Sequence, residues 1–317
     1  MGGAELINFI KENIGTLITP AVSIAGTLMA AIHLRKKTSI ETSTQEFEKI
    51  KAGHLKEAAD ELLKSGKMTY TEYYKMNNFL DIAKKADGLW KERQTEEVKT
   101  ESERYDFDWF MRFYDAVGTV SDEEMQELWA KILAGEILQQ GSYSLRTLET
   151  LRNLSKQEAV LFRKICSYSI NSSNRLLYLP NYEEYLEFAH ITFGEVLKLS
   201  EYGLILCNSF LYTKIEVEAE IKMVCNNNEL VMFVQSKQED EKRILEISQF
   251  PLTDTGKELS MVIGASASNE SVLQFGKLLK DKKGDEFNFS VNRILSIREN
   301  GIEYDDINLL EGTENIQ

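Results

Sequence analysis

The side chains that most often carry out chemistry are few in this sequence and lie apart from one another. They are three cysteines and three histidines, at Cys166, Cys207, Cys225, His33, His54 and His190. Zinc sites use such residues at short, regular spacings, and a nucleophilic cysteine needs a histidine beside it. The sequence shows no such spacing, and each cysteine lies in an apolar stretch. We therefore expect reduced thiols in a protein core, no metal site and no cysteine–histidine dyad.

A short acidic run is the other candidate for catalysis. Ser121-Asp122-Glu123-Glu124 precedes an apolar repeat, and paired carboxylates could act as general acid and base. The same residues are what a helix start requires. Ser121 can accept from the third helical amide while Glu124 reaches back, and carboxylates in a first turn interact favourably with the helix dipole. The run predicts a helix cap rather than a catalytic pair.

Arg146 is the remaining residue with possible site chemistry. It lies three residues before Glu149, a spacing that allows either a structural ion pair or a site for an anion. Phosphate-binding loops and nucleophile motifs are absent from the sequence. The sequence therefore predicts no catalytic residue, no cofactor and a protein that is not an enzyme.

The first element of the chain is an apolar run. Residues 14–34 contain no charged side chain, and Arg35, Lys36 and Lys37 follow directly. A helix crosses the hydrocarbon core of a bilayer with roughly 20 residues, so the run is long enough to span a membrane. Basic flanks tend to stay on the cytoplasmic side. We expect a bacterial inner-membrane protein with most of its chain in the cytoplasm, the alternative being a wholly cytoplasmic protein.

Small side chains recur every four residues within this run, at Gly15, Thr19, Ser23, Thr27 and Ala31. Such a row lets helices approach closely in a membrane, so it predicts a face for homo-oligomers, with Leu28 beside it. Pro20 and the modest hydrophobicity leave three readings open. The run is a spanning or inserted helix, an interfacial helix, or a buried helix of a soluble core.

The charge of the chain restricts its partners. The formal net charge is −14 at pH 7, and the pI is about 4.9. Broad nucleic-acid binding depends on a basic face, so nucleic acid is not an expected partner. A protein is the expected class of partner.

Apolar spacing predicts the remaining elements. Periods of three and four residues predict helices over 41–104 and 108–165, and alternation predicts strands over 212–224, 230–234, 244–250 and 287–297. Helices, a YGLI ending, a hairpin and then LTDTGKEL follow in the order typical of winged-helix modules.

These elements predict a mainly α fold. It has an N-terminal hydrophobic helix, a helical middle domain and a C-terminal α+β winged-helix-like module. The expected domains are a membrane-interacting segment (1–37), a charged helical region (38–104), a helical core (105–170) and the winged-helix-like domain (171–317).

The segments SDEEMQELWAKILAGE, GSYSLRTLETLRNLS and QEAVLF within residues 108–165 resemble an uncharacterised bacterial family, domain of unknown function 2806. They are similar, more loosely, to the abortive-infection alpha family. The resemblance implies a mainly helical protein associated with phage exclusion or mobile-element defence, and it supplies no catalytic residue. Its motif positions in this chain are Trp109, Ser121, Glu124, Leu128, Trp129, Leu133, Glu136, Ser144, Arg146 and Leu148. Among them Trp109, Trp129 and Arg146 are candidates for contact with a partner.

Two hypotheses follow. In the first, the chain is a non-enzymatic anti-phage protein of the abortive-infection type. Its cytoplasmic part senses a phage or host protein as the trigger and is coupled to a membrane-acting N-terminal helix that oligomerises. In the second, it is a soluble binding or regulatory protein whose winged-helix-like domain contacts DNA or a protein.

Overall fold

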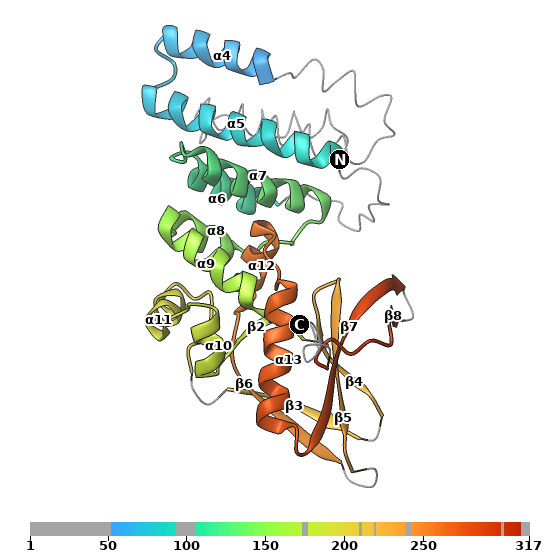
Figure 1. The fold of residues 1–317 in the computed structure, drawn as a ribbon. Coiled ribbons are helices and arrows are strands. Elements are labelled where there is room, and N and C mark those ends of the chain that lie inside the picture. The colour runs from blue at the N-terminus through green and yellow to red at the C-terminus, as the bar shows by residue number, and fades with distance from the viewer. Residues whose placement is uncertain are drawn as a thin grey trace, which may run out of the picture. The chain divides into compact units, whose positions relative to one another are not determined.

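The computed structural model describes residues 52–92, 106–172, 177–208, 211–218, 220–238, 242–298 and 301–311. The chain divides into two compact units, which meet in the sequence between Asn153 and Leu154. The described part of the first unit is helical, and the second unit combines helices with two sheets (Figure 1). The predicted segment 1–37, with its small-residue row and basic flank, lies outside the described residues. No helix in the described ranges is long and apolar enough to cross a membrane.

The helical unit has an aromatic core. Its described helices are α4 (Ala52–Lys64), α5 (Tyr70–Glu92), α6 (Phe107–Val117), α7 (Glu123–Leu138) and α8 (Leu145–Asn153). Helix α5 packs against α4, α6 and α7, and α6 packs against α8. The ring of Phe113 stacks on Trp109 at 5.1 Å and meets Trp129 edge-on at 5.6 Å. These rings are buried, and such pairs stabilise a core beyond the area that they bury.

Helix α7 begins as the sequence predicts, but with a different cap. The side chain of Asp122 accepts a hydrogen bond from the amide of Met125 at 3.1 Å, so Asp122 is the N-cap rather than Ser121. Aspartate and serine are about equally good N-cap residues, so the residue types alone do not tell which of Ser121 and Asp122 caps the helix. Glu123 and Glu124 then occupy the first turn, and both are exposed.

The second unit combines five helices and two antiparallel sheets among its described residues. The helices are α9 (Lys156–Tyr168), α10 (Glu183–Phe188), α11 (Phe193–Glu201), α12 (Asp254–Ile263) and α13 (Asn269–Lys283). Sheet 1 has the order β1-β2-β6-β3, with strands β1 (Ile170–Asn171), β2 (Leu177–Pro180), β6 (Arg243–Pro251) and β3 (Tyr212–Val217). Sheet 2 has the order β4-β5-β7-β8, with strands β4 (Lys222–Asn226), β5 (Leu230–Ser236), β7 (Phe287–Arg298) and β8 (Gly301–Tyr304).

The predicted mainly α fold with a C-terminal winged-helix-like module is therefore wrong, and the chain is α+β. The strand segments were expected to form a hairpin beside helices. They instead pair across two four-stranded sheets, which satisfy the backbone groups of every described strand on at least one side. The alternation in the sequence identified the strands but not how many of them join one sheet.

One predicted strand, 212–224, is two strands in different sheets. β3 ends at Val217, which lies opposite Arg243 of β6, whereas β4 begins at Lys222, opposite Val234 of β5. Alternation predicts an extended chain and the side of the sheet that each residue faces, and it says nothing of the partner strand. This switch between sheets distributes the strands over two layers.

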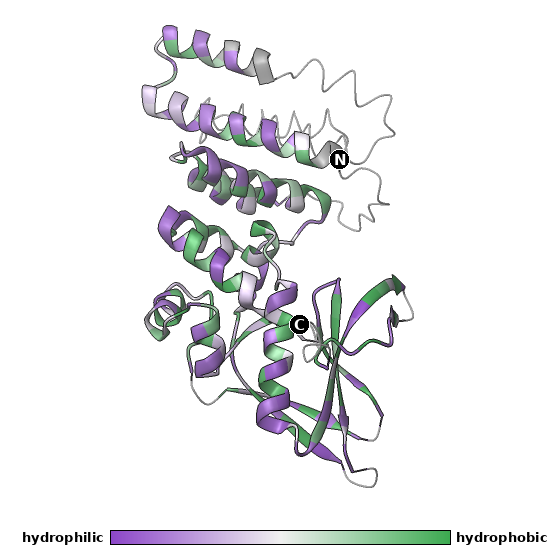
Figure 2. Ribbon diagram, viewed as in Figure 1, coloured by the Kyte–Doolittle hydropathy of each residue, from purple (hydrophilic) through white to green (hydrophobic). Residues whose placement is uncertain are grey.

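Helix α13 lies close against sheet 2 because it carries a glycine at the contact. A Cβ at Gly276 would lie 2.9 Å from the Val291 side chain and 3.1 Å from that of Leu310. The glycine thus lets α13 approach β7. Only residues 284–286 connect the two elements, so the hydrophilic C-terminal turn of α13 lies beside the first residues of β7 (Figure 2).

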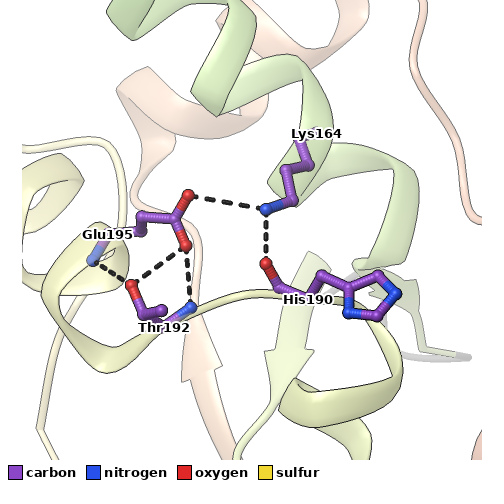
Figure 3. Close-up of polar contacts among 4 residues, drawn as sticks. All are labelled: Lys164, His190, Thr192 and Glu195. Carbon is purple, nitrogen blue, oxygen red and sulfur yellow. Dashed lines mark hydrogen bonds and ion pairs between the residues drawn. The ribbon is translucent and has the colours of Figure 1, made fainter.

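Helix α11 is fixed to α9 at its N-terminal end (Figure 3). The amine of Lys164 donates to the carbonyl of His190 and lies 3.4 Å from a carboxylate oxygen of Glu195. That carboxylate also accepts from the backbone N–H and the hydroxyl of Thr192, which form a capping box. Burial alone would raise the pKa of Glu195, but these hydrogen bonds together lower it.

A second contact fixes the other end of α11. The buried carboxylate of Glu158 accepts from the Tyr202 hydroxyl at 2.6 Å, from the Ser155 amide at 2.9 Å, and lies 3.3 Å from Lys198. Ser155 and Glu158 form the capping box that the sequence predicts for α9. The Tyr202 hydroxyl contributes most to lowering the pKa of Glu158 to about 2, with the Ser155 amide next, while burial acts in the opposite direction.

The Glu158 contact predicts an acid-sensitive stability. Because the folded-state pKa lies below the unfolded one, this carboxylate stabilises the fold above about pH 4.5 and loses that effect as the pH falls toward 2. We expect Glu158→Gln to lower the free energy of unfolding at pH 7 by about 1–2 kcal/mol, and to flatten its decline in acid. Urea denaturation from pH 7 to pH 3 measures both. The exposed Glu201→Gln on α11 is the control, and equal acid profiles for the two variants would contradict the prediction.

The first turn of α12 predicts a second stability effect. A Cβ at Gly256 would lie 2.0 Å from the carbonyl oxygen of Leu204, a backbone atom that cannot rotate away. We expect Gly256→Ala to destabilise the second unit by about 2 kcal/mol or more, because the helix or the turn must shift. Gly194→Ala in α11, where the nearest atom lies 4.0 Å away, should be neutral or slightly stabilising. Denaturation midpoints followed by circular dichroism compare them, and equal midpoints would show that this approach is not tight.

Candidate binding groove

A groove of about 480 Å³ opens on sheet 2 beside α13. We call it the β7 groove. Its walls come from β5, from residues 287–290 of β7, from the C-terminal turn of α13 and from Asn308 and Glu311. Its volume lies within the range of known ligand sites. All of these elements belong to the second unit.

The outer edge of β7 explains where the groove lies. On its inner side β7 pairs with β5 over its first half, from Phe287 opposite Ser236 to Arg293 opposite Leu230. In an antiparallel pair every second residue points its N–H and C=O away from the partner. On β7 these are the odd-numbered residues 287–293, and their outward groups need other partners.

The chain itself satisfies the upper part of this edge. Strand β8 pairs with β7 from Ile294 to Arg298. Next, the Arg293 amide donates to the side chain of Asp305 at 3.1 Å, and the Asp305 amide donates to the Arg293 carbonyl at 3.0 Å. The outer edge of β7 is thus paired with β8 and Asp305 from Arg298 to Arg293.

Asn308 covers the next positions. Its side-chain oxygen accepts from the Val291 amide at 3.1 Å, and its side-chain nitrogen donates to the Phe289 carbonyl at 3.2 Å. The amide of Leu309 donates to the Val291 carbonyl at 2.8 Å. The carboxamide of Asn308 therefore supplies the acceptor and the donor that a neighbouring strand would otherwise supply.

The part of the chain that the structure describes does not pair with the outer edge of the first residues of β7, which lie beyond Asn308. Among the described residues, no hydrogen bond satisfies the outward N–H of Phe289 or the outward N–H and C=O of Phe287. These groups border the β7 groove, and the side chains of both residues are buried on the side of α13. An open edge of this kind is a template for another strand.

Three carboxylates line the mouth of the groove. Asp281 lies in the last turn of α13, Asp285 follows two residues after the helix ends at Lys283, and Glu311 lines the same groove. No ion pair within the described ranges joins Asp281 or Asp285 to a cation, and the helix dipole adds negative potential at this end. Two lysines, Lys237 and Lys280, also line the groove, and the amine of Lys280 lies 3.5 Å from the carbonyl oxygen of Leu310.

The apolar part of the groove lies on the other face of the sheet. Phe233 lies opposite Ser290, and its ring contacts that of Tyr304 at 4.5 Å. Ile221, directly before β4, is 56% exposed and lines the same groove. The groove thus joins an apolar sheet face to an acidic helix end around an open strand edge.

The residues predicted from the sequence as partner contacts lie in the other unit. Trp109 and Trp129 are 5% and 0% exposed, so both belong to the core of the helical unit. Arg146, at the start of α8, is exposed, and within the described residues no ion pair joins it to Glu149. Contact of Arg146 with a partner stays a prediction. The small-residue row, Leu28 and the basic flank lie outside the described residues.

The family motif has a structural role that the helix periodicity did not reveal. The carboxylate of Glu136, near the end of α7, accepts from the amides of Gly141 at 2.7 Å and Tyr143 at 3.2 Å. The indole N–H of Trp109 donates to the Tyr143 carbonyl at 2.9 Å. Burial raises the pKa of Glu136, against the effect of these backbone donors. The two side chains together hold the turn between α7 and α8.

The cysteines and histidines do not form a site within the described residues. Burial raises the pKa of the Cys166 and Cys225 thiols to about 12 each, and that of Cys207 in the same direction. No group of three histidine, cysteine or carboxylate side chains able to hold a metal ion occurs in these ranges. The absence of enzymatic activity stays a prediction.

A family model with the description "Protein of unknown function (DUF2806)" matches residues 68–275. The chain belongs to this family. The match confirms the resemblance read from residues 108–165 and extends it from the start of α5 into α13. The β7 strand and Asn308 lie beyond the matched range. No curated protein and no solved structure matches the chain.

The turn held by Trp109 generates a prediction for the helical unit. Trp109→Phe keeps the ring stack but leaves the Tyr143 carbonyl without its donor, so we expect a loss of about 1 kcal/mol in the free energy of unfolding. Hydrogen exchange of residues 139–144 should accelerate at the same time. Arg146→Ala, at an exposed position, is the control. Exchange in that turn unchanged by Trp109→Phe would show that the indole does not hold it.

Proposed function

We propose that this chain is a non-enzymatic bacterial binding protein in which the β7 groove receives a segment of a partner protein. The open edge at Phe287 and Phe289 carries the proposal. Proteins that do not use such an edge cover it or place charges that oppose pairing. Here the chain covers the edge at Arg293 and Val291, and no described residue pairs with it at the groove. Adding a strand to an open edge is a common form of peptide recognition.

The apolar N-terminal segment suggests how binding in the groove could lead to a biological effect at a membrane. Residues 14–34 are long enough to enter a bilayer, and the small-residue row suits association of helices within it. The resemblance of residues 108–165 to defence families suggests an anti-phage role of the abortive-infection type. In this proposal a phage or host protein occupies the groove, and the N-terminal segment then acts on the inner membrane as a homo-oligomer.

The charges of the groove argue against nucleic acid as its ligand. Three carboxylates, on Asp281, Asp285 and Glu311, outnumber the two lysines that line the groove, whereas binding of nucleic acid relies on a basic surface. The net charge of −14 acts in the same direction. A polypeptide is the ligand class that fits both the open backbone edge and the acidic mouth.

Phage challenge of cells that express the full chain tests the proposal. Leu28→Arg places a charge in the apolar run and should abolish both protection and retention in carbonate-washed membranes. Ser290→Trp fills the groove floor and should abolish protection while the protein stays in the membrane fraction. Ser266→Trp, at an exposed loop position outside the groove, is the matched control and should leave both intact. Full protection by Leu28→Arg would refute the membrane role, and full protection by Ser290→Trp would refute the role of the groove.

A further inference from the structure

We infer that the β7 groove binds its partner as an added β-strand, and that this strand carries a lysine or arginine that meets Asp281 and Asp285. The inference rests on the proposed function, because it names the form and the chemistry of the segment that the groove receives. It makes the partner an extended basic peptide rather than a helix, a small molecule or a second copy of this chain.

The backbone of β7 sets the position of the added strand. Asn308 already pairs with Val291 and with the carbonyl of Phe289. The next outward-facing backbone groups along this edge of β7 are the N–H of Phe289 and the N–H and C=O of Phe287. A strand that enters the groove can pair with β7 directly after Asn308. Phe287 and Phe289 together offer this strand three backbone hydrogen bonds.

The alternation of side chains sets what the strand must carry. A residue paired with Phe287 or Phe289 points to the same face as its neighbour, which is the face covered by α13. That face holds Asp281 and Asp285 at the mouth of the groove. The residues between point to the opposite face, toward Phe233 and Ser290.

Electrostatics decide the type of side chain on the α13 side. Asp281, in the last turn of α13, lies near the negative end of the helix dipole, and Asp285 follows two residues after the helix ends at Lys283. A cation placed between these two carboxylates is attracted to both, and Glu311 adds to the attraction. On the opposite face, Phe233 and the exposed Ile221 favour apolar side chains. The expected pattern alternates a basic residue with apolar ones.

Selection of random ten-residue peptides on the full-length chain, followed by calorimetric titration of the synthetic winners, tests the inference. Winners should carry lysine or arginine in alternation with apolar residues. Methylation of the backbone nitrogen that donates to Phe287 should weaken binding at least tenfold, whereas methylation of the adjacent nitrogen should not. The double variant Asp281→Asn, Asp285→Asn should weaken binding about tenfold and reduce its dependence on salt. Glu270→Gln, in the first turn of the same helix, is the matched control and should have no effect.

Ser290→Trp separates this inference from the proposed function. If it abolishes binding while methylation and the aspartate variant do not, the groove binds polypeptides but not as an added basic strand, and the inference fails alone. If no winner distinguishes Ser290→Trp from Ser266→Trp, the groove is not a polypeptide site, and both fail. If the free chain self-associates and Ser290→Trp abolishes that association, a second copy is the occupant, which also overturns the inference.

Discussion

The backbone hydrogen bonds on the outer edge of β7 are the constraint on which the second unit depends. β7 is the longest described strand, and β5 satisfies its inner side over the first half. The outer side needs successive partners from later in the chain. β8 supplies the first, Asp305 and Asn308 supply the next, and no residue within the described ranges pairs with the last positions. The position of the groove follows directly from where this cover ends.

Packing around the edge keeps the groove in shape. The absent Cβ at Gly276 brings α13 against β7, which places Asp281 and the following Asp285 beside the open positions. Phe287 and Phe289 are buried on that face, so the edge groups between them are held by a packed core rather than by a loop. A site on a strand that is fixed in this way requires little ordering when a ligand binds.

The sequence predicted the local elements of this chain better than their arrangement. Alternation located β5, β6 and β7 within a few residues, and the Ser155–Glu158 capping box of α9 is confirmed. The class was wrong because pairing of strands is a long-range property. Nothing in residues 212–224 shows that the chain changes sheets between Val217 and Lys222.

The groove could not be predicted from the sequence for the same reason. Its open edge is defined by which residues fail to find partners, and Asn308 lies far enough along the chain that its pairing with Phe289 and Val291 carries no local signal. The tryptophans show the opposite case. Aromatic residues in the family motif suggested contact with a partner, whereas the helix periodicity directs Trp109 and Trp129 into the core.

Residue-resolved amide hydrogen exchange of β7 in the free chain is the most direct measurement of this account. We expect slow exchange at the amides of Val291 and Arg293, because their outward N–H groups donate hydrogen bonds to Asn308 and Asp305. We expect fast exchange at the amides of Phe287 and Phe289. A bound peptide should slow the latter two. Slow exchange at Phe287 and Phe289 in the free chain would contradict the account, because it would show that the edge is already paired.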